Sequence, residues 1–332
     1  MKRTGGWRVR LAVLYAALAL FFGAYAVSYF RRFSLGVAQE ISIYVCLMLL
    51  FALALAPGFP ALRTILRERV QGFRGAACCV LLFLLPYLLY CAGTGDFRWP
   101  AFAKVLSLTA LPFVLFAAVP AQRPERLTWQ DAVVLLGLLL PVLFGKIHGI
   151  WNVPENLDFM ARVYLLGVGA WAFLILRGVE GSGYEFRWPA ASAGDSLVAF
   201  AGFSAVALPL GFWLRFIAWN PQFQGVWELL VDYATIFLFI AILEEFFFRG
   251  VLQNLLEGSL RSRYAAQALA AVIFGLSHIR HAPSPNWRYV ALATVAGWFY
   301  GLAYRNHRSL IASSAVHALV DTLWRTWLTL PN

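Results

Sequence analysis

Charged side chains are scarce in this chain. Asp, Glu, Lys and Arg make up 13% of its 332 residues, whereas 61% of the residues are hydrophobic. A soluble domain usually carries about 25% charged residues, so this composition excludes an ordinary soluble enzyme and indicates a protein that crosses a lipid bilayer many times. The net charge of +11 then reflects arginines in short loops between helices. We therefore expect the bilayer as a partner and no nucleic acid.

Cysteine is also rare, and its four residues have no metal-type or CxxC spacing. Cys46, Cys78, Cys79 and Cys91 all fall within apolar runs, where cysteine behaves as a small buried hydrophobe. The sequence has no HExxH motif of zinc proteases. It also lacks the GxSG motif of serine intramembrane proteases.

Apolar runs long enough to cross a bilayer recur along nearly the whole chain. The first follows Lys2, Arg3, Arg8 and Arg10 and continues to Phe30, which is longer than a secretory signal core, so we expect it to remain as a helix. The sequence predicts an all-α, polytopic transmembrane helical bundle of about eleven helices (nine to eleven). They are expected at residues 11–30, 41–56, 76–94, 101–119, 131–145, 160–177, 195–218, 231–256, 264–280, 288–304 and 308–325.

Arginines and lysines orient these helices. If the helices simply alternate, the more basic loops share one side with the N-terminal tail, including the loops that hold Arg63 to Arg74, Arg123 and Arg126, and Arg305 and Arg308. Because cytoplasmic loops carry an excess of Lys and Arg, we expect a cytoplasmic N-terminus. The chain is expected to be an integral multi-pass protein of the bacterial inner membrane.

Three ionisable residues stand together in one of the apolar runs, as Glu244-Glu245-xxx-Arg249. A charged side chain at the centre of a membrane helix costs about 2.5–3.5 kcal/mol, so such groups usually have partners and a use. Glu245 and Arg249 are four residues apart and can pair on one helix face. Glu244 points about 100° away from them, which leaves it available for chemistry.

Further polar residues lie in two later helices. Phe274 and His278 share one helix face, as do His317 and Asp321. Counted from the same membrane side, Glu244, His278, His317 and Asp321 lie roughly 14–21 Å deep, at 1.5 Å of rise per residue. We therefore expect them to meet in one layer.

A carboxylate beside a neutral histidine can take a proton from water, and further donors can stabilise an oxyanion. Glu244 with His278 suits the first task, and His317 with Asp321 the second. The expected reaction is hydrolysis of an amide bond without a covalent intermediate and without a metal or other cofactor.

In their order along the chain, these motifs resemble the glutamate-dependent intramembrane proteases of the CAAX protease and bacteriocin-processing (CPBP, or Abi) family. That family includes the type 2 (Ras-converting) CAAX prenyl proteases, and its signature is EExxxR, FxxxH and HxxxN or HxxxD on successive helices. Here these read Glu244-Glu245-xxx-Arg249, Phe274-xxx-His278 and His317-xxx-Asp321. The resemblance covers residues 231–325, and residues 1–190 match no known pattern.

The resemblance implies a catalytic role for Glu244, His278, His317 and Asp321, with structural support from Glu245, Arg249 and Phe274. Many members carry Asn at the last position. Asp321 donates a hydrogen bond only when it is protonated, so it could instead orient His317. The implied domains are N-terminal scaffold helices over 1–190 and a CPBP-like protease domain over 191–332. The implied substrate is a membrane-anchored protein or peptide.

Two other functions remain open from the residues alone. Glu244, His278 and His317 have acceptable ligand chemistry for a zinc-dependent intramembrane protease. Buried acids and histidines also form proton relays, which would suit a non-enzymatic transporter or an immunity protein against a peptide toxin.

Overall fold

The fold is all-α, as predicted, and the chain divides into two compact units. A computed structural model describes residues 6–120, 123–155 and 157–330. Unit 1 comprises residues 1–124 and 129–178, and unit 2 comprises residues 125–128 and 179–332. Lys2 and Arg3, used above to orient the chain, lie outside the described residues.

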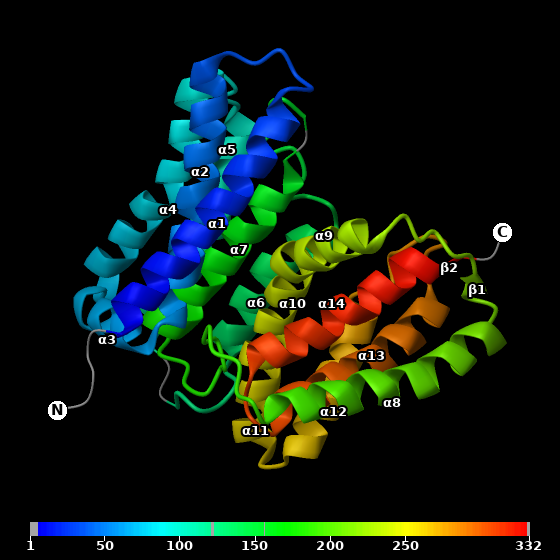
Figure 1. The fold of residues 1–332 in the computed structure, drawn as a ribbon. Coiled ribbons are helices and arrows are strands. Elements are labelled where there is room, and N and C mark those ends of the chain that lie inside the picture. The colour runs from blue at the N-terminus through cyan, green and yellow to red at the C-terminus, as the bar shows by residue number, and fades with distance from the viewer. Residues whose placement is uncertain (1–5, 121–122, 156, 331–332) are drawn as a thin grey trace. The chain divides into compact units, whose positions relative to one another are not determined.

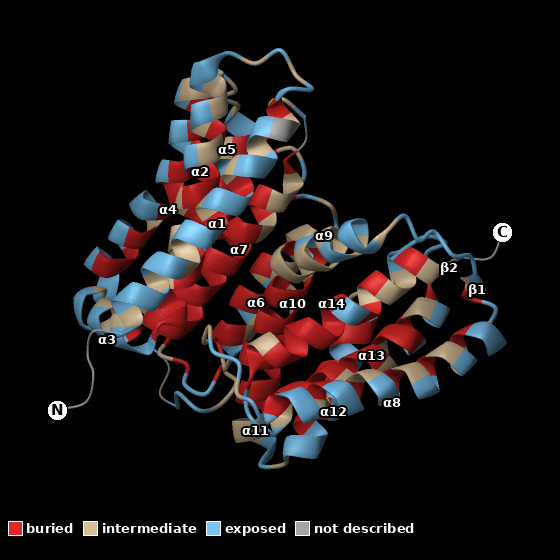
Figure 2. Ribbon diagram, viewed as in Figure 1, coloured by how far each residue is buried: buried red, intermediate tan, exposed pale blue. Residues whose placement is uncertain are grey.

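Unit 1 contains nine helical segments, counted over the residues that the structure describes. They are α1 (Gly6–Phe30), α2 (Val37–Leu55), η1 (Ala56–Gly58), α3 (Pro60–Arg69), α4 (Gly72–Thr94), α5 (Trp99–Ala118), α6 (Trp129–Leu143), α7 (Asp158–Ala170) and η2 (Trp171–Leu176). The run from α7 through η2 is 83% buried over its most apolar window, whereas α1 is only 11% buried (Figure 2). The α7–η2 run therefore forms the core of this unit.

Arg63, which the sequence placed in a loop, and Arg177 both have structural partners in unit 1. The segment around Arg63 forms the short helix α3, which we did not predict, and Arg63 donates to the Pro57 carbonyl over 2.8 Å. Arg177 is buried and pairs with Asp131 at 2.8 Å. A buried arginine contributes to the core and gives no information on topology.

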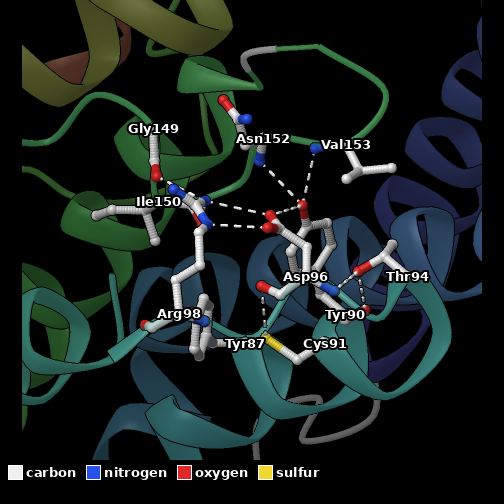
Figure 3. A network of polar contacts seen from close by, with 10 residues as sticks. All are labelled: Tyr87, Tyr90, Cys91, Thr94, Asp96, Arg98, Gly149, Ile150, Asn152 and Val153. Atoms are coloured by element: carbon white, nitrogen blue, oxygen red, sulfur yellow. Dashed lines mark hydrogen bonds and ion pairs between the residues drawn. The ribbon is translucent and has the colours of Figure 1, made fainter. Parts of the chain in front are cut away.

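A polar network ties together two loops of unit 1 (Figure 3). Asp96 accepts hydrogen bonds from Tyr90 at 2.8 Å and from two nitrogens of Arg98 at 2.8 and 3.1 Å. The Tyr90 hydroxyl also accepts from two backbone amides of the α6–α7 loop, and Arg98 donates to two of its carbonyls; these belong to Asn152, Val153, Gly149 and Ile150. The network thus fixes the α6–α7 loop against the α4–α5 loop.

Unit 2 is built around α13. Its described elements are α8 (Ser192–Trp213), β1 (Ala218–Trp219), α9 (Val226–Ile236), η3 (Phe237–Ala241), α10 (Ile242–Glu245), η4 (Phe246–Gln253), α11 (Asn254–Leu260), α12 (Arg263–Leu276), α13 (Trp287–Arg305), α14 (Leu310–Trp327) and β2 (Leu328–Thr329). Helix α13 packs against α8, α12 and α14 (Figure 1). The two short strands pair antiparallel, with Ala218 opposite Thr329.

Small residues allow α12 and α13 to lie close together. A Cβ atom at Gly275 of α12 would lie 2.7 Å from the carbonyl oxygen of Val290 and 3.0 Å from the backbone nitrogen of Thr294, both on α13. Because Cβ atoms essentially never approach backbone so closely, only glycine fits at this crossing. This close approach sets the position of the turn that carries His278.

The run from α9 to α11 is one continuous helix with two π-helical stretches, η3 and η4. Glu244 and Glu245 occupy the short α-helical turn between them. Single π-helical turns occur frequently at functional sites, because they shift the facing of side chains on either side. The predicted helix 231–256 is therefore confirmed, with its described ends at Val226 and Leu260.

The segment 179–187 belongs to unit 2, whereas we predicted it as part of the N-terminal scaffold over 1–190. Asn254 donates to the Glu180 carbonyl over 2.7 Å, and Tyr304 donates to the Gly181 carbonyl over 2.8 Å. The Tyr184 ring lies 5.2 Å from the Phe246 ring. This extended segment therefore holds η4 and α13 at one end of the unit.

Seven helical segments among the described residues are long and apolar enough to cross a membrane. Helices α6 and α12 are shorter apolar helices, with 15 and 14 residues. All eleven predicted ranges overlap helical segments. The chain is a multi-helix membrane protein.

Candidate active site

The buried part of the site is the ion pair of Glu245 and Arg249. Neither side chain is exposed, and Arg249 Nη1 lies 3.1 Å from Glu245 Oε1. Arg249 also donates to the Gly297 carbonyl of α13 over 2.9 Å. A buried charge is tolerated only when it is paired and hydrogen-bonded, and both conditions hold here.

Aromatic rings surround the guanidinium of Arg249. Its central carbon lies 4.6 Å from the Phe274 ring centroid and 5.4 Å from that of Tyr300. Cations are attracted to aromatic faces at such distances, and more strongly where water is excluded. Phe274 therefore contacts the buried ion pair from α12, in agreement with a supporting position for this residue.

Helix α14 completes the coordination of Glu245. The His317 Nδ1 atom lies 2.9 Å from Glu245 Oε1, and the Ser313 hydroxyl donates to Glu245 Oε2. The two α14 residues are four apart, so both point at the same carboxylate. From the sequence, we predicted only Arg249 as a partner of Glu245. Ser313 was not predicted, although its four-residue spacing to His317 could have identified it.

The other side of the His317 ring faces two further carboxylates. Its Nε2 atom lies 3.5 Å from Asp321 Oδ2 and 3.9 Å from Glu244 Oε2. The His317 side chain is 4% exposed, whereas Glu244 and Asp321 are 28% and 38% exposed. The two acids are therefore partly exposed, while the imidazole stays enclosed between them and Glu245.

The partners of the His317 ring nitrogens indicate where the ring carries its protons. Its Nδ1 donates to Glu245, since an ionised carboxylate only accepts, and its Nε2 faces two more carboxylate oxygens. A bare Nε2 lone pair would be repelled by two ionised carboxylates, so a proton lies between Nε2 and these oxygens, and we place it on Nε2. The ring is then a hydrogen-bond donor directed into the site.

Tyr300 of α13 holds the His317 ring from one face. The two rings are stacked with centroids 4.5 Å apart and planes 14° apart, and the Phe274 ring meets the same imidazole edge-on at 5.8 Å. Packing of this kind fixes the orientation of a ring whose two nitrogens have different partners. Tyr300 is a second residue that the motif spacing did not reveal.

His278 lies in the turn that follows α12 and not within the helix, because α12 ends at Leu276, earlier than the predicted end at 280. Its Nδ1 lies 2.9 Å from the Phe274 carbonyl oxygen, to which it donates. In the neutral form of this ring, Nε2 then carries the free lone pair. No direct contact joins His278 to Glu244 in the described part of the chain.

The loop after α12 places His278 and Glu244 in a common environment. His281, in this loop, stacks on the His278 ring with centroids 5.5 Å apart. Burial and the neighbouring His278 lower the pKa of His281, and Glu244 partly offsets this. Glu244 and His278, the two residues predicted to activate water, therefore both influence the pKa of His281.

The predicted residues divide into three sets by position. The structure brings Glu244, His317 and Asp321 together, and it places Glu245, Arg249 and Phe274 beneath them. His278 lies at the edge, joined to the others through Phe274, whose ring contacts both histidines at 4.8 and 5.8 Å. Over the described residues, no group of three or more His, Cys, Asp and Glu side chains has the geometry to hold a metal ion.

Part of the chain matches a known protein family. Residues 226–323 match the family model described as type II CAAX prenyl endopeptidase Rce1-like. The matched segment is less than a third of the chain. No curated protein and no solved structure matches the chain. The matched segment runs from the start of α9 into α14 and contains all three motifs. This match confirms the resemblance predicted from the motifs. Residues 226–323 resemble the Rce1-like type II CAAX prenyl endopeptidases.

Proposed function

We propose that this chain is an intramembrane endopeptidase that hydrolyses a peptide bond in a membrane-anchored protein or peptide by activating water. The family match supports a protease. The observation that carries the mechanism is the position of His317, whose Nε2 lies between Glu244 and Asp321 while its Nδ1 is bonded to Glu245. A donor and a water-accessible base thus lie side by side.

Glu244 is the general base in this proposal. Its side chain is more exposed than that of the adjacent Glu245. Glu245 already neutralises Arg249. As the water oxygen attacks the scissile carbonyl carbon, Glu244 takes one water proton. The free Nε2 of His278 orients the same water from the other side.

His317 stabilises the oxyanion that forms. The π electrons of the carbonyl move onto its oxygen, which then accepts a hydrogen bond from Nε2–H of His317. Asp321, an acceptor, orients that proton and balances its charge. When the C–N bond breaks, the proton held by Glu244 goes to the leaving nitrogen, so the products are a carboxylic acid, which keeps the second water proton until it ionises, and an amine.

The substrate class follows from the family name and remains a proposal. A type II CAAX prenyl endopeptidase acts on prenylated C-termini, and we propose such a peptide as the first substrate to test. We further propose that the chain lies in a bacterial inner membrane with a cytoplasmic N-terminus, on the strength of its more basic loops.

The test is cleavage of a farnesylated CAAX peptide by the purified full-length protein in liposomes, followed by mass spectrometry. The proposal expects one new peptide C-terminus, formed by wild-type protein and not by Glu244→Gln. If neither protein cleaves it, membrane peptides that accumulate in cells expressing Glu244→Gln identify the substrate. Equal product from both proteins, or equal peptide profiles in both cell types, would contradict the proposal and favour the transporter alternative.

A further inference from the structure

Tyr289 lies in the first turn of α13, beside the loop that carries both histidines. Its ring centroid is 4.9 Å from His278 and 4.8 Å from His281. On its other sides it contacts Phe216 at 5.4 Å and lies nearly parallel to Trp324 at 6.3 Å. Rings from three parts of the unit therefore fix the position of this phenol.

The hydroxyl of Tyr289 has no hydrogen-bond partner within the described residues, in contrast to the hydroxyls of Tyr304 and Tyr90. Tyr304, on the same helix, donates to the Gly181 carbonyl, and Tyr90 donates to Asp96. Tyrosine hydroxyls in enclosed positions usually find a partner. An oriented donor without a protein partner is thus available to a ligand.

The surroundings of Tyr289 place it at the catalytic acids. It lies within Coulombic range of both Glu244 and Asp321. Tyr300 is coupled to Asp321 and Glu245 instead, and its ring is committed to stacking on His317. Of these two α13 tyrosines, Tyr289 is therefore the one that packs on the proposed water-orienting His278.

The proposed mechanism has a place for such a donor. An oxyanion is best stabilised by more than one preorganised hydrogen bond, and His317 Nε2–H supplies one. The residue four positions later is Asp321, a carboxylate that only accepts when ionised. A second donor must then come from another element, and α13 is the helix that packs between α12 and α14.

We infer that Tyr289 is a catalytic residue whose hydroxyl donates the second hydrogen bond to the oxyanion of the tetrahedral intermediate; this inference rests on the proposed function. The water oxygen forms the new C–O bond, Glu244 receives the water proton, and the carbonyl π pair moves to the oxygen held by Tyr289 and His317. Tyr289 keeps its own proton throughout. On collapse of the intermediate, the hydrogen bond weakens as the negative charge leaves that oxygen.

The experiment compares Tyr289→Phe with wild-type protein and with Tyr304→Phe, all reconstituted as full-length protein with the farnesylated peptide. Tyr289→Phe removes one oxygen and retains the ring that packs on His278. The kcat of this variant is expected to fall about 100-fold, as for loss of one oxyanion donor, with KM and thermal midpoint unchanged. Tyr304→Phe, which loses a structural hydrogen bond, should lower the thermal midpoint while the folded fraction keeps its kcat.

An inhibitor series separates catalysis from packing. A farnesylated peptide aldehyde, whose hydrate is a tetrahedral gem-diol that mimics the intermediate, should lose affinity for Tyr289→Phe as kcat/KM falls, while the uncleaved product peptide binds both proteins equally. A wild-type kcat in Tyr289→Phe, or parallel loss of aldehyde and product binding, would overturn the inference while leaving the proposed function intact. Failure of wild-type protein to cleave any peptide that accumulates with Glu244→Gln would overturn both.

Discussion

Glu245 and His317 are joined by a 2.9 Å hydrogen bond between Oε1 and Nδ1, and this bond connects the buried ion pair to the exposed part of the site. On one side of it, Arg249 neutralises Glu245. On the other, the same imidazole presents Nε2 to Glu244 and Asp321. The two adjacent glutamates thus have separate positions, since Glu245 is bonded to the imidazole at Nδ1 and Glu244 faces it at Nε2.

Removing one partner of the buried pair should destabilise the protein. Arg249→Ala leaves Glu245 as a buried charge with only histidine and serine partners, and breaking such a pair costs about 3–5 kcal/mol. We expect a strong loss of folded yield in detergent and a lower thermal midpoint. The double variant Glu245→Gln/Arg249→Met removes both charges and should recover part of that stability; no recovery would show that the pair itself is not the cause.

His317 should be sensitive to loss of its second nitrogen. His317→Asn places an amide near Glu245 but removes the Nε2 donor that faces Glu244, so kcat is expected to fall by about 10²–10⁴. Single-turnover cleavage rates measure this effect. His317→Asn activity within a few-fold of wild type would remove the oxyanion role of this ring.

The sequence predicted the helices and the pairs of polar residues that share a helix face. Each membrane-length apolar run became helical because backbone groups in lipid must bond within their own segment. Spacing also identified the pairs Glu245–Arg249 and His317–Asp321, since residues four apart share a helix face. These are local relationships, which period and spacing determine.

Relationships between helices were not predictable in the same way. Nothing in the sequence around Glu245 states that Ser313 and His317, about seventy residues later, share its carboxylate. The packing of segment 179–187 on η4 and α13 depends on backbone carbonyls, which leave no sequence pattern. His278 was placed inside a helix because the apolar run continues beyond Leu276, where α12 ends.

Two substitutions of Asp321 distinguish between two roles for this residue, a carboxylate that orients His317 and a hydrogen-bond donor to the oxyanion. In Asp321→Asn the amide oxygen still accepts from His317 Nε2–H, and the new N–H can donate, so we expect activity within about tenfold of wild type. Asp321→Leu, of similar size, removes both abilities and should reduce kcat at least about 100-fold. Steady-state kinetics of the two variants make the comparison, and equal losses in both would show that the negative charge itself is required.

The polar network of unit 1 should contribute stability without affecting chemistry. Asp96→Asn weakens the charge-assisted bonds from Arg98 and disturbs the anchor of the α6–α7 loop, which we expect to cost about 1–3 kcal/mol (Figure 3). The thermal midpoint and protease sensitivity of that loop measure the loss. Thr94→Ala, which removes only a neutral hydroxyl at the same loop, is the matched control and should have a smaller effect. A drop in kcat of the folded Asp96→Asn protein would contradict a purely structural role.

The most direct test of the account is the cleavage rate of Glu244→Gln beside that of wild-type protein at equal folded concentration. Glutamine retains the shape of Glu244, which is partly exposed, so folding should be unchanged. The account predicts that kcat falls by about 10²–10⁴ because the amide cannot take a proton from water. A Glu244→Gln protein that cleaves at the wild-type rate would contradict it.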